Sequence, residues 1–194
     1  MDGTWLYYSL VQGRTERSCP VARKFGPNWH QTHHVDWSKL PSIIAGNIRE
    51  QLNKQKVHSQ SMNVDITRSS VFTSLRADTE VGSLRDTMLH RFYQNNFDVH
   101  RFETKMHQEK CVDISLAVEM LYMATVPNAY DIAVIVTGDM DFMPALEKTR
   151  LLGKRTAICS FRNSINQDML APEARIRDFD VIWLDEYLDQ LIVP

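Results

Sequence analysis

A run of five consecutive apolar residues, Ile132 to Val136, limits the possible fold more than any other part of the sequence. Such a run, ending here in Thr137-Gly138-Asp139, is typical of a strand that is covered on both faces, as in a parallel sheet. The segment Phe142 to Leu152 follows with helical spacing, with Asp141 as the expected N-cap and Gly153 just past its end. A buried strand that leads directly into a helix favours an α/β architecture.

The alternation of strand and helix patterns extends along the rest of the chain. Seven further segments carry such patterns: strands over 70–75, 97–102, 156–161 and 181–184, and helices over 40–52, 82–95 and 113–125. Strands that alternate with helices are joined by right-handed crossovers, which place helices on both faces of the sheet. We therefore expect a three-layer α/β fold with a mostly parallel sheet flanked by helices on both faces.

Length and composition favour one domain. The chain has 194 residues, against roughly 150 for an average domain, and 43% of them are apolar, which is enough for a core. We interpret residues 1–194 as a single domain with an insertion loop at about 11–41, where prolines and glycines interrupt the periodicity.

The N-terminus has the pattern of a strand end that turns into a helix, Met1-Asp2-Gly3-Thr4-Trp5, although the strand itself is reduced to Met1. This would be the central strand, so we expect a truncated first strand whose neighbours carry unpaired ladder groups. A targeting segment upstream of Met1 is compatible with this pattern.

Charge and cysteine content restrict the partners and the compartment. Lys plus Arg number 22 and Asp plus Glu number 24, so the net charge of −2 gives no overall positive field, and RNA must meet a local basic patch. Three widely spaced cysteines fit neither a disulfide framework nor a CxxC metal motif, so we expect the cytoplasm or another reducing compartment. No apolar run reaches the roughly 18 to 20 residues of a membrane span, so no membrane partner is expected.

Acidic residues follow the predicted strands at the edge where a parallel sheet binds its ligands. Asp2 follows the first strand, Asp139 follows the apolar run, Asp141 comes two residues later, and Asp113 opens the helix after the 97–102 strand. Carboxylates gathered at one edge repel one another unless a cation neutralises them, and oxygen-only ligands favour magnesium or manganese. Taken singly, Asp113 and Asp141 are better explained as stabilising residues at helix N-termini.

Four segments occur in order along the chain: Asp2-Gly3 before an aromatic helix start, Glu109-Lys110-Cys111-Val112-Asp113, Val136-Thr137-Gly138-Asp139-Met140-Asp141-Phe142, and Leu152-Gly153-Lys154-Arg155. Together they resemble the NYN domains, a branch of the PIN-like nucleases, and the third segment is the specific part. The resemblance implies a metal-dependent ribonuclease that uses Mg²⁺ or Mn²⁺ and acts on RNA, single-stranded by preference. It also implies that the catalytic and metal-binding positions are Asp2, Asp113, Asp139 and Asp141, and that a homodimer is an option. One departure is Thr4-Trp5, where many members have a small residue and Asn.

Hydroxyl and basic side chains near the same edge are candidates for binding RNA. Thr137 and Ser160 end neighbouring strands, where a hydroxyl can hold a phosphate or a ligating carboxylate, or can be an ordinary strand-end hydroxyl. Arg162 follows the 156–161 strand, and Lys110 precedes Asp113 by three residues; either can contact a phosphate, although an ordinary surface lysine explains Lys110 equally well.

Two regions outside this edge also carry basic or metal-binding side chains. Lysines and arginines at 148–155 surround a helix end, where such charges more often complement the helix dipole. In residues 11–41, basic residues alternate with aromatic ones, a pattern suited to single-stranded nucleic acid, although such rings more often pin a loop to its domain. The spacing of Cys19, His30, His33 and His34 matches no standard zinc finger.

Two other classes of function stay open. One is a catalytically silent PIN-like module that binds RNA or a protein. The other is a phosphohydrolase, because Asp139-Met140-Asp141 resembles the DxD nucleophile motif of haloacid-dehalogenase-like enzymes, although that family places its motif after the first strand. A phosphate-binding loop for nucleotides is excluded, since neither GxGxxG nor GxxxxGK(S/T) occurs.

Overall fold

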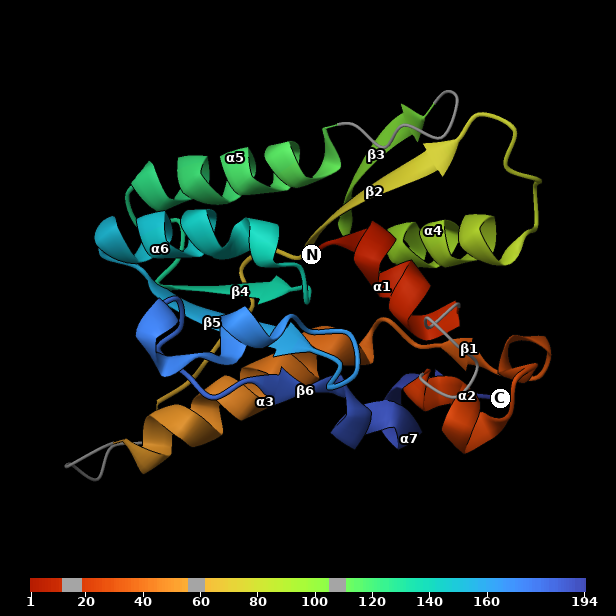
Figure 1. The fold of residues 1–194 in the computed structure, drawn as a ribbon, viewed down its shortest axis with the longest axis horizontal. Helices are drawn as coiled ribbons and strands as arrows, with labels where there is room; N and C mark the ends of the chain where they lie inside the picture. Colours follow the sequence, from red (N-terminus) through yellow and green to blue (C-terminus); the bar gives the residue numbers. More distant parts are fainter. Residues whose placement is uncertain (12–18, 56–61, 105–110) are drawn as a thin grey trace.

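The computed structural model describes residues 1–11, 19–55, 62–104 and 111–194. Strands lie at the centre of the molecule with helices packed around them (Figure 1). The helices are α1 (Gly3–Val11), α2 (Pro20–Phe25), α3 (Lys39–Lys54), α4 (Leu84–Gln94), α5 (Val112–Thr125), α6 (Met143–Leu151) and α7 (Leu188–Leu191). The strands are β1 (His34–Val35), β2 (Ser70–Arg76), β3 (Asp98–Thr104), β4 (Ile132–Val136), β5 (Arg155–Ser160), β6 (Ile182–Trp183) and β7 (Ile192–Val193).

The strands form two parallel groups and one antiparallel pair. β2 pairs with β3, β4 pairs with β5 and β5 with β6, all in parallel, whereas β1 and β7 are antiparallel. The backbone of Met1 and Asp2 lies between the two parallel groups: the N–H of Phe72 donates to Met1 O at 2.9 Å, and the N–H of Asp2 donates to Val136 O at 3.1 Å. The order across the sheet is therefore β3, β2, Met1–Asp2, β4, β5, β6, with the shortened central strand that the sequence predicts.

Two clusters of buried apolar side chains explain why β4 and β5 are almost entirely apolar. Ile135 and Ile158 pack into a cluster with side chains of α5 and α6. Val136 and Ala157, their neighbours along the strands, pack into a second cluster with side chains of α1, α3 and α4. Successive residues of a strand point to opposite faces, so both faces of the sheet are covered and the predicted three-layer arrangement is confirmed.

Each predicted strand and helix of the core coincides with an observed element, but the prediction for the start of α6 is wrong. α6 begins at Met143 after Phe142, which makes no capping bond, rather than after an Asp141 N-cap. Asp141 belongs to a one-turn 3₁₀ helix, η2 (Met140–Phe142), whose N-cap is Asp139. The structure also places α2, a 3₁₀ turn and β1 within the segment predicted as an insertion loop.

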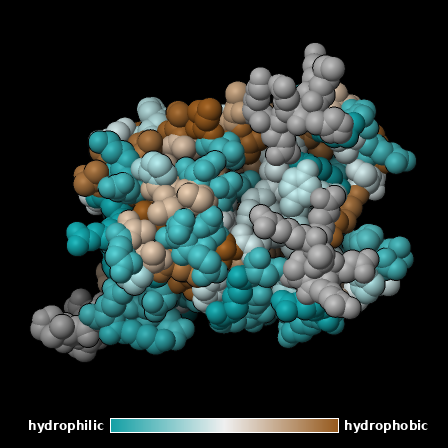
Figure 2. Space-filling model, in the orientation of Figure 1, coloured by the Kyte–Doolittle hydropathy of each residue, from teal (hydrophilic) through white to brown (hydrophobic). Residues whose placement is uncertain are grey.

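Helix α5 carries a regular apolar stripe on its exposed face. Ile114, Val118 and Tyr122 lie four residues apart on α5, and each is more than half exposed. Figure 2 shows apolar surface over α5 at the top of the view. None of the helices in the described part of the chain has the length and apolar character to cross a membrane.

Candidate active site

The carboxyl ends of the central strands bring Asp2 next to the residues that follow β4. Asp2 is only 3% exposed. Its Oδ1 accepts a hydrogen bond from the backbone N–H of Trp5 at 2.9 Å, and its Oδ2 accepts one from the hydroxyl of Thr137 at 3.1 Å. The first bond closes the start of α1, so Asp2 both ends the central strand and anchors the helix that follows.

Burial raises the pKa of Asp2 to about 6, and the nearby charge of Asp113 raises it as well. The hydrogen bonds from Trp5 and Thr137 act in the opposite direction. Val112 at the start of α5 packs in the same apolar cluster as Phe72, which pairs with Asp2, so the first turn of α5 lies at the same edge as Asp2, although Asp113 itself is exposed. A buried carboxylate beside a second carboxylate is stabilised in its charged form by a nearby cation.

Thr137 connects Asp2 to the third predicted aspartate. Its side chain is fully buried, and its hydroxyl donates to Asp2 while it accepts the backbone N–H of Asp139 at 3.2 Å. The sequence allows either a phosphate or a carboxylate as the partner of this hydroxyl, and in the structure the partner is a carboxylate. Thr137 therefore fixes the orientation of Asp2 relative to the turn after β4.

Asp139 and Asp141 occupy that turn. Oδ1 of Asp139, which is half-buried, accepts the backbone N–H of Asp141 at 3.0 Å, and the side chain of Asp141 is exposed. Gly138 allows the turn to pack tightly, because a Cβ at this position would lie 2.2 Å from the carbonyl oxygen of Ser164. The carbonyl of Gly138 also accepts the N–H of Asn166 at 2.9 Å. The loop 161–166 thus holds the position of Asp139.

Trp5 is a positioning residue that sequence reasoning missed. Its indole Nε1 donates to the carbonyl of Ser164 at 3.1 Å, and in the next turn of α1 the hydroxyl of Ser9 donates to that of Ser164 at 3.0 Å. The loop 161–166 therefore contacts both α1 and the turn that carries Asp139. The only sequence signal was the departure of Thr4-Trp5 from the family pattern, which we interpreted as the loss of a polar group.

Ser160 and Arg162, the other predicted site residues that the structure describes, contact groups other than these aspartates. Ser160 is fully buried, and its hydroxyl lies 3.5 Å from the carbonyl oxygen of Phe161. Arg162 is exposed, its guanidinium pairs with Glu186, and it lies over the ring of Trp183 at 4.5 Å from the centroid. Lys110 lies outside the described residues.

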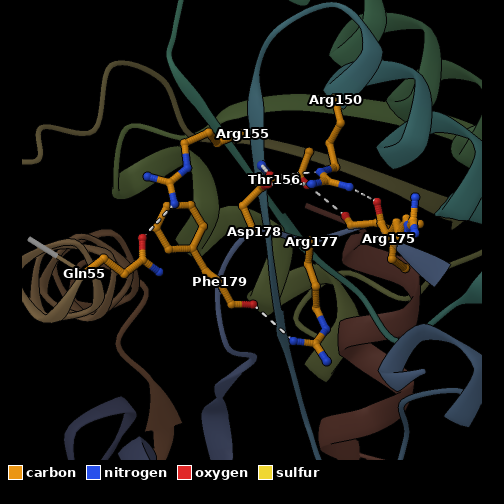
Figure 3. A network of polar contacts seen from close by, with 9 residues as sticks. Gln55, Arg150, Arg155, Thr156, Arg175, Arg177, Asp178 and Phe179 are labelled. Carbon is orange, nitrogen blue, oxygen red and sulfur yellow. Dashed lines mark hydrogen bonds and ion pairs between the residues drawn. The ribbon is translucent and has the colours of Figure 1, made fainter. Parts of the chain in front are cut away.

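Arg150 and Arg155, near the end of α6, belong to a separate polar network (Figure 3). Arg150 pairs with Asp178, whose carboxylate also accepts the backbone N–H of Thr156 at 2.8 Å. Arg155 donates to Gln55 at 2.9 Å and lies 4.1 Å from the ring centroid of Phe179. Because Arg155 begins β5, this network lies at the opposite edge of the sheet from Asp2, and it secures the chain before β6.

Oxygen ligands alone would suit a hard divalent cation, and the raised pKa of Asp2 fits that chemistry. Among the residues that the structure describes, however, no three His, Cys, Asp or Glu side chains come close enough together to form a metal site. Instead, pairwise interactions connect the four aspartates one after another. The charge of Asp113 acts on Asp2, and Thr137 joins Asp2 to Asp139. The carboxylate of Asp139 then accepts the backbone N–H of Asp141.

A parallel α/β sheet with aspartates after its central strands defines a PIN-like fold. The chain belongs to the NYN domain family, whose model matches residues 18–178, and the NYN domains are generally nuclease-like. A solved structure of a protein of unknown function from Vibrio parahaemolyticus is similar, with a TM-score of 0.53 at 14% identity over 82% of this chain and 83% of that one. At this identity the similarity shows the fold alone. No curated protein matches the chain.

The raised pKa of Asp2 predicts that this group makes the protein less stable as the pH rises. Between its ordinary value of 3.8 and about 6, the folded state keeps a proton that the unfolded state has lost. The contribution is therefore most favourable below pH 4 and falls by about 3 kcal/mol as the pH rises through 6. Urea denaturation from pH 4 to 7 should show this decline in the native protein relative to Asp2→Asn.

The comparison with Asp2→Asn is needed because burial also lowers the pKa of the Met1 amino group to about 5, with an opposite effect on stability. The amino group is present in both proteins, and the charge of Asp2 raises its pKa, so the difference between their curves reports the carboxylate together with its effect on this amino group. A constant difference between pH 4 and 7 would show that Asp2 titrates normally in the folded state.

Proposed function

We propose that the chain is a metal-dependent ribonuclease that hydrolyses phosphodiester bonds of single-stranded RNA at the edge marked by Asp2, Asp113, Asp139 and Asp141. The observation that carries the proposal is the buried Asp2 carboxylate, which Thr137 links to the turn that carries Asp139. A structural role for Asp2 in starting α1 needs only the hydrogen bond to Trp5 and does not explain this link. Membership of the NYN domain family supports the same function.

In this proposal, Asp2 and Asp113 would hold a Mg²⁺ or Mn²⁺ ion, which supplies an activated water and stabilises charge on the leaving oxygen. Thr137 keeps the Asp2 carboxylate in one orientation through its hydroxyl. Asp139 is fixed by the backbone N–H of Asp141, so its carboxylate stays at the rim of the same edge. The exposed carboxylate of Asp141 is placed to orient groups that approach from solvent.

The catalytically silent module is the second candidate, because the described residues provide no three-ligand metal group. Such a module would bind RNA through the same surface and leave it intact. The phosphohydrolase has less support, since Asp139 follows β4 rather than the first strand of the sheet.

Labelled single-stranded RNA incubated with the protein tests the proposal. We expect cleavage in Mn²⁺ that stops on addition of EDTA and falls by at least about a hundredfold in Asp139→Asn. Asp131→Asn is the matched control, because Asp131 is exposed and precedes β4 at the opposite edge of the sheet. It should cleave like the native protein, and the loss of cleavage in Asp139→Asn prepared in the same way excludes a contaminating nuclease as the source of activity.

Three outcomes would contradict the ribonuclease. Equal RNA binding by the native protein and Asp139→Asn, with no cleavage by either, would identify a silent module. Cleavage that survives in Asp139→Asn would come from another site or another protein. Release of phosphate from a generic monoester, without RNA cleavage, would identify a phosphohydrolase.

A further inference from the structure

A cavity of about 260 Å³ lies away from the aspartates, between the end of α1, the segment 29–37 and α4. Its walls include apolar side chains, among them Leu10, Val35 and Met88. The remaining walls carry the guanidinium of Arg91 and the imidazoles of His33 and His34. All its lining residues lie within the described chain, and none of them is acidic. A cavity with apolar walls, a guanidinium and imidazoles but no carboxylate suits an anion that has an apolar body.

Two buried donors in the walls of this cavity have no hydrogen-bond partner within the described residues. They are the indole Nε1 of Trp37, a side chain that is only 2% exposed, and Nε of Arg91. A buried N–H without an acceptor costs free energy, and native proteins satisfy the great majority of such groups. Both side chains line the cavity, so an acceptor on a bound ligand would lie next to the two groups that lack one.

The electrostatic environment favours an anion as that ligand. Burial lowers the pKa of His34, and the positive charges of Arg91 and His33 lower it further, against the opposing charge of Asp36. Arg91 therefore places a positive charge beside His34. Arg91 appears in no ion pair among the described residues, so its guanidinium is available to pair with a phosphate.

We propose that this cavity binds a small organic phosphate with a flat ring, in which Arg91 and the indole N–H of Trp37 bind the phosphate and the apolar walls hold the ring. This chemistry is shared by a free nucleoside monophosphate and by the 5′-phosphorylated end of an RNA. A phosphate satisfies several donors at once, whereas a single carboxylate offers fewer acceptors to a wall with one guanidinium, an indole N–H and imidazoles. The proposal concerns binding only and does not depend on the ribonuclease activity.

Calorimetric titration in EDTA, where no metal-dependent cleavage takes place, tests the proposal with AMP, adenosine and two short RNAs that differ only in a 5′-phosphate or 5′-hydroxyl. We expect AMP to bind at least about tenfold more tightly than adenosine, because the phosphate makes charge-assisted hydrogen bonds. If the phosphorylated RNA binds as tightly as AMP, the source is an RNA end. If it binds far more weakly, the source is a free mononucleotide. Either result supports the cavity.

Two variants assign the binding to this cavity. Trp37→Phe keeps the ring and removes its N–H, and Arg91→Gln removes the charge; each should weaken AMP binding by about tenfold. Arg101→Gln is the control, because Arg101 lies on β3 and pairs with Glu103 at the surface. Equal binding of AMP and adenosine, no binding of AMP, or full affinity in both Trp37→Phe and Arg91→Gln would overturn the proposal. If the native protein binds AMP but does not cleave RNA, only the proposed ribonuclease activity is contradicted.

Discussion

Replacement of Asp113 by Asn is expected to lower the pKa of Asp2 and to reduce Mn²⁺-dependent RNA cleavage by at least about a hundredfold. Asp113 is exposed in the first turn of α5, and its charge is one of the causes of the raised pKa of Asp2. Without that charge, the carboxylate of Asp2 ionises more easily, yet one of the two groups proposed to hold the cation is gone. Activity should therefore fall while the free energy of unfolding at pH 7 changes little, because the easier ionisation of Asp2 offsets the loss of a favourable charge in the first turn of α5.

A loss of RNA cleavage without a loss of stability in Asp113→Asn distinguishes a charge needed for function from one needed for folding. The pKa of Asp2 can be followed by NMR of its carboxyl carbon, cleavage by gel assay, and stability by urea denaturation. Asp131→Asn again serves as the control, since Asp131 lies at the other edge of the sheet. A lower pKa with unchanged cleavage would remove Asp113 from the proposed cation site, and an unchanged pKa would mean that Asp113 does not act on Asp2.

The substitution Gly138→Ala should have the largest effect on stability. The new Cβ would lie 2.2 Å from the carbonyl oxygen of Ser164 and 2.7 Å from Cα of Ile165, and both are backbone atoms that no side-chain rotation can move. The loop 161–166 must then shift, which we expect to cost about 3 kcal/mol and to displace Asp139 enough to abolish cleavage. Urea denaturation midpoints measure the first effect, and the RNA assay measures the second.

Gly46→Ala provides the matched comparison. Gly46 lies inside α3, where an added Cβ meets nothing within 4 Å, so Ala should stabilise the protein by up to about 1 kcal/mol. Cleavage by this variant should be unchanged. If Gly138→Ala were as stable as the native protein, the contact between the turn after β4 and Ser164 would not exist in solution.

The sheet and its helices were predictable because each depends on local patterns. The apolar run 132–136 identifies a strand covered on both faces, and the helical spacing over 113–125 matches α5 to within one residue. Asp141 was assigned to the wrong role because an acidic residue before a helix looks the same whether it caps that helix or lies in a preceding turn. The backbone hydrogen bond from Asp141 to Asp139 decides between the two, and it is not visible in the sequence.

The candidate site was only partly predictable. The motif around Asp139 indicated an acidic edge, but the contacts that set its geometry join distant parts of the chain, as between Asp2 and Thr137 or Trp5 and Ser164. Contacts between distant parts of the chain also explain why the prediction for Ser160 was incomplete. It lies at a strand end, as predicted, but it pairs with Trp183 of β6, so a neighbouring strand covers it.

The loop 161–166 has a mechanical consequence for the acidic edge. It is hydrogen-bonded to Trp5 and Ser9 on one side and to Gly138 on the other. Gly138 has no side chain, so its backbone packs directly against the loop. A displacement of this loop is therefore transmitted to α1 and to Asp139 at the same time. The start of α1 and the turn that carries Asp139 are coupled through this loop. A force on the outer side of the loop would therefore shift the carboxylates without contacting them.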